Sequence, residues 1–232
     1  MASTTTPRPT TPPSAPGAAR PGLAVRVLGD THLLGRRSVQ LLVGLAVYGV
    51  SMALMLRSGL GLDPWDVLHQ GLQRSLGLSV GAWVTLCGAL VLLLWIPLRQ
   101  RPGLGTVANV LLIGAAMDLT LRLFDGPQGW PARIALMAGA IVLNAVATGL
   151  YIGARFGPGP RDGLMTGLHR RTGRSLRLIR TGIEVAVLAV GILLGGTAGV
   201  GTVAYALAIG PLVQVFLPWL TVPGPAQTPR KG

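Results

Sequence analysis

Residues 61–114 read GLDPWDVLHQGLQRSLGLSVGAWVTLCGALVLLLWIPLRQRPGLGTVANVLLIG, and residues 157–210 read GPGPRDGLMTGLHRRTGRSLRLIRTGIEVAVLAVGILLGGTAGVGTVAYALAIG. The two stretches lie 96 positions apart and are identical at 22 of 54 positions without a gap. Composition alone would give identity at about a tenth of the positions. The identities also include scarce residue types, such as Asp66 paired with Asp162. We therefore predict that the chain is an internal duplication and folds as two similar repeats.

The composition indicates the medium in which these repeats fold. Half of the 232 residues are hydrophobic, only 12% are charged, and the mean hydropathy is +0.58. Such a chain has too little polar surface to enclose a soluble globule, so it is predicted to be a polytopic membrane protein. The net charge of +13 would suggest nucleic acid in a soluble protein. Here it is better explained by membrane topology, and no nucleic-acid partner is expected.

Six segments are apolar enough to cross a hydrocarbon core of about 30 Å, which takes about 20 helical residues. They are residues 39–56, 80–98, 106–124, 134–152, 179–194 and 200–220. Each repeat then contains three spans, and an odd number of spans inverts the second repeat relative to the first. Inverted repeats are typical of secondary transporters. We predict an all-α fold of six transmembrane helices, arranged as two inverted three-helix repeats.

The positions of the basic residues predict the orientation. In the six-span arrangement, 16 of the 20 Lys and Arg residues fall on one side, and only Arg57, Arg74, Arg122 and Arg133 fall on the other. By the positive-inside rule, both termini are expected in the cytoplasm. The basic cytoplasmic face is also expected to attract anionic lipid headgroups.

The chain is divided into four segments on these grounds. Residues 1–35 are predicted to be a disordered or interfacial cytoplasmic tail, because their Thr- and Pro-rich start has no apolar periodicity. An interfacial helix over residues 23–34 would be interrupted at Gly29. Membrane repeat 1 covers 36–125, membrane repeat 2 covers 132–220, and 221–232 form a second disordered cytoplasmic tail.

A polar loop follows the first span of each repeat and is predicted to hold a short helix. In the first copy, Asp63 provides an N-cap acceptor before Pro64, and Gly77 is a suitable end. Polar residues recur at four-residue spacing on one face of this helix: Asp66, Gln70 and Arg74, with Asp162, Thr166 and Arg170 in the second copy. Two interpretations remain open, an interfacial helix on the membrane surface or a re-entrant helix that points into a shared cavity.

Charged residues at membrane depth are costly and therefore mark functional candidates. Glu184 lies within the fifth span, where it could bind a ligand or simply pair with Arg180 four residues earlier. Asp118 and Arg122 have the same spacing in the third span and are expected to pair. The candidate substrate- or ion-binding residues are Asp66, Asp162, Glu184, Arg74, Arg161, Arg170 and Arg180. The carboxylates would bind a cation, protons or a polar solute, and the Arg residues would balance their charge.

Signatures of catalysis and of metal or cofactor binding do not appear in the sequence. The single cysteine, Cys87, lies in an apolar span, and the three histidines are not spaced as metal ligands. Nucleotide-binding loops, nucleophile elbows and HExxH motifs are also missing from the chain. We therefore expect a protein that is not an enzyme, with no catalytic residue, no cofactor and no metal site.

The second repeat carries one further pattern. It comprises Gly159-Pro160-Arg161-Asp162-Gly163, Arg180, Ile183-Glu184-Val185, Gly199, Gly201-Thr202 and Ile209-Gly210-Pro211. Over residues 36–220 this pattern resembles the YczE-like bacterial integral membrane proteins. The resemblance implies a multi-pass protein of a bacterial plasma membrane. It adds weight to Arg161, Asp162, Arg180 and Glu184 as residues that such proteins use.

Two functions fit these observations. The first is a small-solute or metabolite transporter with inverted repeats, which would bind a small polar solute or a proton. The second is a non-catalytic membrane scaffold or regulator of a biosynthetic or export partner. The sequence leaves open the substrate and whether the protein acts as a homodimer.

Overall fold

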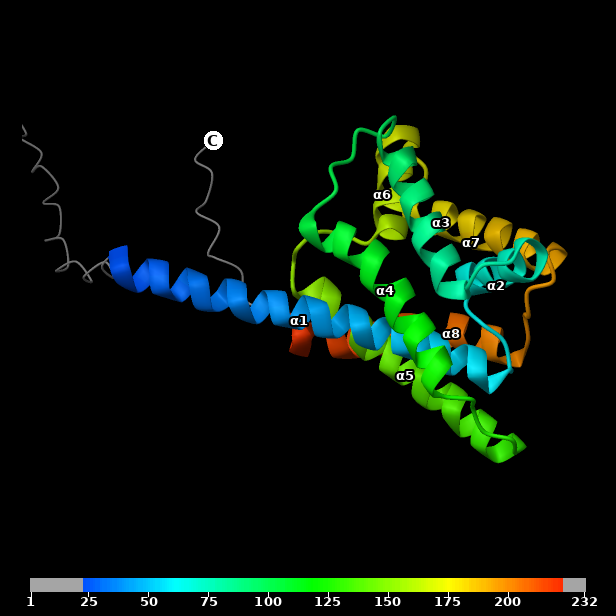
Figure 1. The fold of residues 1–232 in the computed structure, drawn as a ribbon. Helices are drawn as coiled ribbons and strands as arrows, with labels where there is room; N and C mark the ends of the chain where they lie inside the picture. Colours follow the sequence, from blue (N-terminus) through cyan, green and yellow to red (C-terminus); the bar gives the residue numbers. More distant parts are fainter. Residues whose placement is uncertain (1–22, 223–232) are drawn as a thin grey trace, which may run out of the picture.

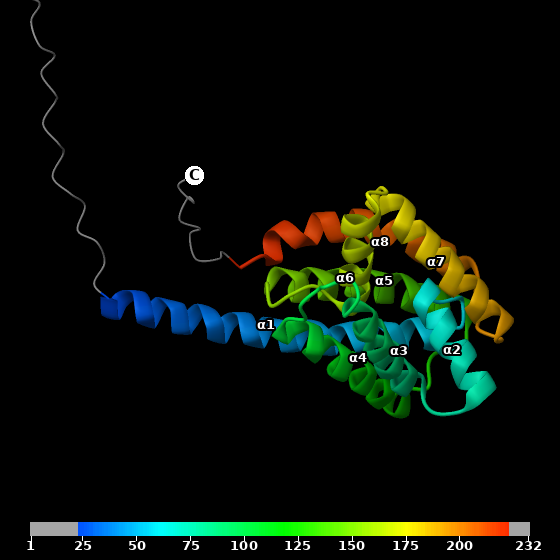
Figure 2. The same ribbon diagram turned by 90° about the horizontal axis from the view of Figure 1, so that it is seen from above.

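The computed structural model describes residues 23–222, which form eight α-helices and no strand. The helices are α1 (Leu23–Ser58), α2 (Pro64–Leu76), α3 (Val80–Trp95), α4 (Leu104–Leu123), α5 (Trp130–Gly153), α6 (Pro160–Thr172), α7 (Leu176–Leu193) and α8 (Val200–Leu220). Figures 1 and 2 show α1 running through the group of helices, with its N-terminal part projecting beyond the others. The predicted tails at residues 1–22 and 223–232 lie outside the described residues.

The helix boundaries follow the sequence duplication. α6, α7 and α8 begin 96 positions after α2, α3 and α4, respectively. The caps are repeated as well, because Ser79 Oγ accepts from the amide of Ala82 and Ser175 Oγ accepts from the amide of Leu178. Each copy of the duplicated stretch thus folds as a short helix followed by two longer helices.

The long helices of the two repeats, α1 and α5, pack along each other in opposite directions. Gln40 Nε2 donates to the carbonyl of Leu150 at 3.0 Å, and Asn144 Nδ2 donates to Ser51 Oγ at 2.8 Å. Residue numbers therefore rise along α1 while they fall along α5. This antiparallel pair forms the centre of the fold, where Leu45 and other α1 side chains are fully buried.

The loop that precedes each short helix is held by a helix of the other repeat. The amide of Gly201 in α8 donates to the carbonyl of Leu60 at 2.8 Å, and the amide of Gly105 in α4 donates to the carbonyl of Phe156 at 3.0 Å. A side chain at Gly199 would overlap the Leu60 carbonyl, which explains glycine there. The repeated Gly-x-Gly-Thr sequence is thus a clasp between the repeats, because peptide carbonyls occupy these helix N-termini.

The short helices are also exchanged between the repeats. α2 packs on α7, and α6 packs on α3. In the first contact the backbones approach closely, since a Cβ on Gly71 would overlap the carbonyl of Gly191. In the second contact the Trp95 indole fills the space next to Gly163, and its Nε1 donates to the carbonyl of Pro160 at 3.0 Å. The two contacts thus join equivalent pairs of helices, but the side chains that fill them differ.

Five helices of the described chain are long and apolar enough to cross a membrane: Leu33–Ser58, Val80–Leu98, Leu104–Leu123, Trp130–Gly153 and Val200–Leu220. The expected span at 179–194 corresponds to α7, which is not among the five because Arg177, Arg180 and Glu184 lie within it. Many large apolar side chains point outward, as a lipid environment requires. The fold is that of a polytopic helical membrane protein.

Two local expectations from the sequence are corrected by the structure. α1 is continuous through Gly29, so no break separates residues 23–35 from the first apolar span. Asp118 does not pair with Arg122. Instead it accepts from the amide of Gly81 at 2.9 Å and from the Ser79 hydroxyl, and so joins α4 to the start of α3.

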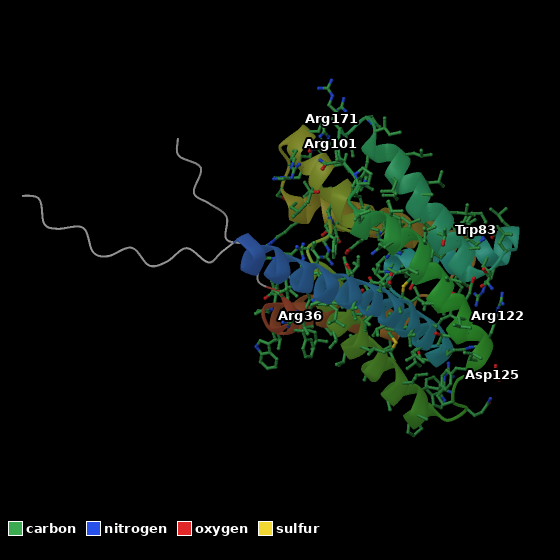
Figure 3. The ribbon with its side chains drawn as sticks, turned by 60° about the vertical axis from the view of Figure 1, so that its left-hand side comes forward. Arg36, Trp83, Arg101, Arg122, Asp125 and Arg171 are labelled. Atoms are coloured by element: carbon green, nitrogen blue, oxygen red, sulfur yellow. The ribbon has the colours of Figure 1, made fainter. Side chains whose placement is uncertain are left out.

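Charged side chains gather at separate ends of the molecule. Figure 3 shows Arg122 and Asp125 together on one side, far from Arg36, Arg101 and Arg171. Asp125 also forms an ion pair with Arg57 at 3.6 Å. The apolar helices run between these two charged regions.

Candidate functional site

The first turn of α2 places two carboxyl groups in the centre of the protein. Asp63 caps the helix, because its Oδ1 accepts from the amides of Trp65 at 2.9 Å and Asp66 at 3.0 Å. Asp66 is the third residue of α2 and is 0% exposed, while Asp63 is 2% exposed. Asp66 Oδ1 is 2.9 Å from His69 Nδ1, one helical turn further on. Three titratable groups are therefore buried within seven residues.

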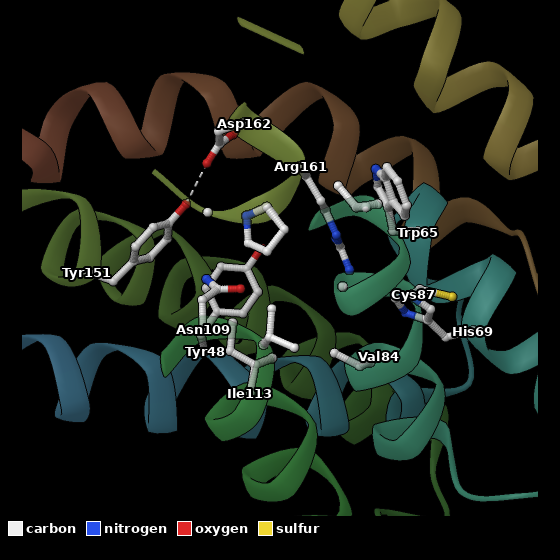
Figure 4. A pocket seen from close by; sticks show the side chains of 15 residues that line it. Tyr48, Trp65, His69, Val84, Cys87, Asn109, Ile113, Tyr151, Arg161 and Asp162 are labelled. Atoms are coloured by element: carbon white, nitrogen blue, oxygen red, sulfur yellow. Dashed lines mark hydrogen bonds between the residues drawn. The ribbon is translucent and has the colours of Figure 1, made fainter. Parts of the chain in front are cut away.

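The first turn of α6 brings a cation to the same place. Arg161 Nη1 lies 3.8 Å from Asp63 Oδ1, and the Arg161 guanidinium carbon lies 4.8 Å from the centre of the Trp65 ring. Arg161 and Trp65 occupy equivalent positions of the two repeats, 96 residues apart. The stacked pair, labelled in Figure 4, is therefore a contact between equivalent positions of the two repeats.

Asp162 is the repeat equivalent of Asp66 but has different surroundings. Its Oδ2 accepts from the Tyr151 hydroxyl at 2.8 Å, a bond drawn in Figure 4. It is exposed, whereas Asp66 is fully buried. The two predicted carboxylates thus approach one region from different helices, and only one of them is sealed inside the protein.

Four buried polar atoms of α2 and its cap have no hydrogen-bond partner within the described part of the chain. They are Asp63 Oδ2, Trp65 Nε1, Asp66 Oδ2 and His69 Nε2. Buried polar groups in proteins are nearly always hydrogen-bonded to protein or water. Such a cluster is therefore typical of a site that binds water, a proton or a ligand.

Two cavities adjoin the Arg161–Trp65 pair. The first cavity, drawn in Figure 4, has a volume of about 50 Å³. It is lined by Tyr48, Trp65, His69, Val84, Cys87, Gly88, Val91, Asn109, Val110, Ile113, Tyr151, Gly159, Pro160, Arg161 and Asp162. The second cavity has a volume of about 90 Å³ and is lined by Tyr48, Asp63, Pro64, Trp65, Arg161, Asp162, Met165, Arg180, Glu184 and Tyr205.

The two cavities occupy equivalent places in the two repeats. Eight of the ten residues that line the second cavity have their repeat partner, 96 positions away, in the lining of the first. These eight are Asp63, Pro64, Trp65, Arg161, Met165, Arg180, Glu184 and Tyr205, and their partners are Gly159, Pro160, Arg161, Trp65, His69, Val84, Gly88 and Asn109. The duplication has therefore produced a pair of cavities that share the Arg161–Trp65 boundary.

The helices α7 and α3 form equivalent walls of the two cavities, but their side chains differ in charge. In the second cavity Arg180 Nε lies 2.8 Å from Glu184 Oε1, so the ion pair expected from the sequence forms and also lines the cavity. The equivalent positions of the first cavity are the uncharged Val84 and Gly88. The walls of α7 and α3 are thus charged in one repeat and apolar in the other.

The structure brings most of the predicted site residues together. Four of them line the cavities: Arg161, Asp162, Arg180 and Glu184. Asp66 does not line a cavity but contacts His69, which does. Two predicted residues lie elsewhere. Arg74 is exposed near the end of α2, where it donates to the carbonyl of Gly195. Arg170 is exposed on α6 beside Arg99 and Arg171.

The polar face of α2 points into the protein rather than towards its surroundings. Asp66 and Gln70 are both buried, and Gln70 Oε1 accepts from the amide of Thr197 at 2.7 Å. Leu76 near the end of the helix is 66% exposed. A helix lying on a membrane surface would show the reverse pattern, with polar groups outward. Of the two interpretations of α2, its burial therefore favours a helix inserted into the bundle.

The sequence prediction missed two site residues, Asp63 and His69. Asp63 was expected only to cap a helix, and His69 was set aside for lack of metal-ligand spacing. His69 follows Asp66 by three residues, which places both on one side of a helix and was a usable signal. No sequence signal marked Tyr48 or Tyr151 as lining residues.

Burial shifts the pKa values of the α2 side chains, which lie outside the five apolar spans. Burial raises the pKa of the Asp66 carboxyl, and the Arg161 guanidinium partly opposes this. Burial also raises the pKa of Asp63, and the negative charge of Asp66 raises it further. Burial lowers the pKa of His69, so its imidazole is neutral at pH 7. Burial therefore shifts both carboxyl groups towards protonation and keeps the histidine uncharged.

The fold and this site define a multi-pass helical membrane protein with a buried charged centre. Residues 35–218 match the model of a family described as "Family of unknown function (DUF6198)", so the chain belongs to that family. An uncharacterized protein of Haemophilus influenzae is 38% identical over 177 residues, which are 76% of this chain and 81% of the relative.

Two Bacillus subtilis proteins are further relatives. The uncharacterized membrane protein YczE is 31% identical over 172 residues, which are 74% of this chain and 80% of that protein. The uncharacterized protein YyaS is 27% identical over 180 residues, which are 76% of this chain and 90% of that protein. The resemblance to the YczE-like proteins is thereby confirmed. No solved structure matches the chain.

Proposed function

We propose that this protein is a small-solute or metabolite transporter of a bacterial plasma membrane, in which two three-span repeats of opposite orientation move against each other. Both termini lie in the cytoplasm, and the basic cytoplasmic face contacts anionic lipid. α7 is the sixth span in this arrangement. Its charged pair, Arg180 and Glu184, lines the second cavity, which reduces the cost of charge at membrane depth.

The contacts between the repeats support the opposite orientation. α1 and α5 are equivalent helices, and they run antiparallel. The exchanged contacts of α2 with α7 and of α6 with α3 are those expected when a twofold rotation relates the repeats. This symmetry, together with three spans per repeat, supports the proposal that equivalent parts of the repeats face opposite membrane sides.

The observation that carries the proposal is the pair of equivalent cavities. They are separated by Arg161 and Trp65, and side chains near the middle of three apolar helices, Tyr48, Cys87 and Ile113, line the first of them. In transporters with inverted repeats, alternating access arises when the two repeats exchange conformations around a central site. Opening one cavity while the other closes would move a solute past the Arg161–Trp65 pair.

A cysteine experiment tests this proposal. In a Cys87→Ala background, Asn109→Cys places one thiol in the first cavity and Tyr205→Cys places one at the equivalent position of the second. A membrane-impermeant maleimide should react with the two thiols from opposite sides. In the double variant, a bulky adduct at position 109 should lower the reactivity at position 205, since both cavities do not open together. Ser75→Cys, which is exposed outside both cavities, serves as the control.

The opposite outcome supports the second function. If both cavity thiols react from one side, or neither reacts while the Ser75→Cys control does, the cavities do not alternate. Independent reactivity in the double variant leads to the same conclusion. The protein would then be a packed membrane scaffold or regulator of a biosynthetic or export partner.

A further inference from the structure

We propose that Asp63, Asp66 and His69 form a proton-binding relay between the two cavities, with Arg161 as its fixed counter-charge. The relay extends the proposed transport function, because it names the proton as the ion that this site exchanges. Proton binding itself is a property of the protein at rest and is measurable without transport.

Each member of the relay has one anchored atom and one free atom. Asp63 Oδ1 is held by two backbone amides, and Asp66 Oδ1 and His69 Nδ1 hold each other at 2.9 Å. The second atoms of all three groups, two carboxylate oxygens and His69 Nε2, have no partner among the described residues. The anchored atoms fix the side chains, and the free atoms are available for protons.

The relay reaches both cavities. His69 lines the first cavity and Asp63 lines the second. Asp66 contacts both residues, through its carboxylate to His69 and through its amide to Asp63 Oδ1. The cavities measure about 50 and 90 Å³, whereas a water needs about 10–15 Å³ by the same kind of measure. Both cavities are therefore large enough for several waters that carry protons to and from the relay.

A proton can pass through His69 without charging the ring permanently. In the tautomer with a proton on Nδ1, that proton is hydrogen-bonded to Asp66 Oδ1. A proton that arrives at Nε2 from the first cavity lets the Nδ1 proton move to Asp66. The ring is then neutral in its other tautomer, and one proton has been transferred to the carboxylate.

The buried groups around the relay carry one more negative charge than positive charge when both carboxyl groups are ionised. Arg161 of α6 pairs with Asp63, and a second buried carboxylate, Asp66, lies in the same helical turn. The other polar groups on this region are Asp162 of α6, Tyr48 of α1, Tyr151 of α5, Arg180 and Glu184 of α7, and Tyr205 of α8. Arg180 and Glu184 neutralise each other, and Asp162 is exposed. An uncompensated buried charge is costly, so the carboxylate pair binds one proton.

The low number of acidic residues makes a direct test possible. The chain contains only seven Asp and Glu residues, so each carboxyl can be assigned by a single variant. Infrared titration of the purified full-length protein in detergent follows the carbonyl stretch of protonated carboxylic acids. We expect a band that persists well above the pH at which exposed Asp titrates, about 3.9. Asp63→Asn and Asp66→Asn should each change or remove this band.

Two further variants sharpen the assignment. Asp125→Asn removes a fully exposed carboxyl and should leave the band unchanged. Arg161→Gln removes the counter-charge and should raise the midpoint of the band by about 1–3 pH units. Size-exclusion profiles report whether each variant is folded, and Asp66→Glu, which keeps a carboxyl, should retain the band.

The results separate this inference from the transport proposal. A band that survives in both Asp63→Asn and Asp66→Asn, or no such band in the unmodified protein, overturns the relay. A band that is lost when sodium replaces choline at constant pH assigns the site to a metal cation instead, and also overturns it. A confirmed band in a protein whose cavity thiols do not alternate would leave a proton site in a protein that is not a transporter.

Discussion

The first turns of α2 and α6 occupy equivalent positions, yet they have different chemistry. α2 is capped by the Asp63 side chain and buries Asp66 against His69, whereas Gly159 at the start of α6 offers no side-chain acceptor and Asp162 is exposed. The duplicated backbone has therefore been kept while the side chains have diverged. The first copy supplies buried titratable groups, and the second copy supplies the cation Arg161 that faces them.

The largest effect is expected where the equivalent short-helix contacts differ. Trp95 is 2% exposed and fills the contact of α3 with α6, whereas the equivalent residue in α7 is Gly191. Trp95→Ala should lower the free energy of unfolding by about 3–5 kcal/mol, because it leaves a cavity and an unpaired carbonyl. Denaturant unfolding of the protein in detergent measures this. Trp219→Ala, at an 81% exposed position, should change it little, and equal losses would contradict the comparison.

An exchange of the residues at positions 65 and 161 tests whether the two repeats provide equivalent surroundings for these side chains. Trp65→Arg and Arg161→Trp would each abolish the stacked pair, and the double variant would restore it with the roles reversed. The double variant should therefore be more stable than the sum of the single effects predicts, by a coupling of about 0.5–3 kcal/mol. The measurement is a double-mutant cycle of unfolding free energies. A coupling of zero would mean that the two positions are not interchangeable.

The pH dependence of stability should distinguish buried from exposed carboxyls. The folded-state pKa of Asp66 is raised, so its contribution is fully present below the unfolded pKa of about 3.9 and is lost as pH rises through the folded pKa. In the unmodified protein the unfolding free energy should fall as the pH rises above 4. Asp66→Asn should make this fall smaller, by about 1.4 kcal/mol for each unit by which the folded-state pKa of Asp66 exceeds its unfolded-state pKa. Asp125→Asn should keep the slope of the unmodified protein, and the same slope in both variants would speak against a titrating Asp66.

The smallest effect is expected from giving α6 the cap that α2 has. A Cβ at Gly159 would make only ordinary contacts with Asp162, Asn109 and Tyr151. Gly159→Asn should stabilise the protein by at most about 0.5 kcal/mol through a side-chain acceptor for the first turn. Thermal unfolding is the measurement, with Gly159→Ala as the matched control that lacks the acceptor. No difference between the two variants would show that the first turn of α6 gains nothing from a cap.

Local features of the fold could be predicted from the sequence. Asp63, Pro64 and Gly77 determine where α2 begins and ends, and each acts on backbone groups within one helical turn. The 96-residue offset then transferred these boundaries to the second copy. Such features depend on neighbouring residues only, which is why one sequence suffices.

Features that depend on distant contacts could not be predicted. Periodicity placed Asp66 and Gln70 on one face of α2, but it cannot tell whether that face meets water, lipid or protein. The four-residue spacing of Asp118 and Arg122 suggested a pair, yet the amide of Gly81 from another helix is the partner. Asp63 likewise became recognisable as a site residue only when α6 brought Arg161 beside it.

The clasps at Leu60 and Phe156 also bear on how the chain is made. When the first repeat leaves the ribosome, the amide of Gly105 has no carbonyl to bind, because Phe156 has not yet been synthesised. α2 likewise lacks α7, its packing surface. We therefore expect the first half to complete its packing only after the second half has been made. We expect halves divided between α4 and α5 to be unstable singly and to assemble when produced together in one cell.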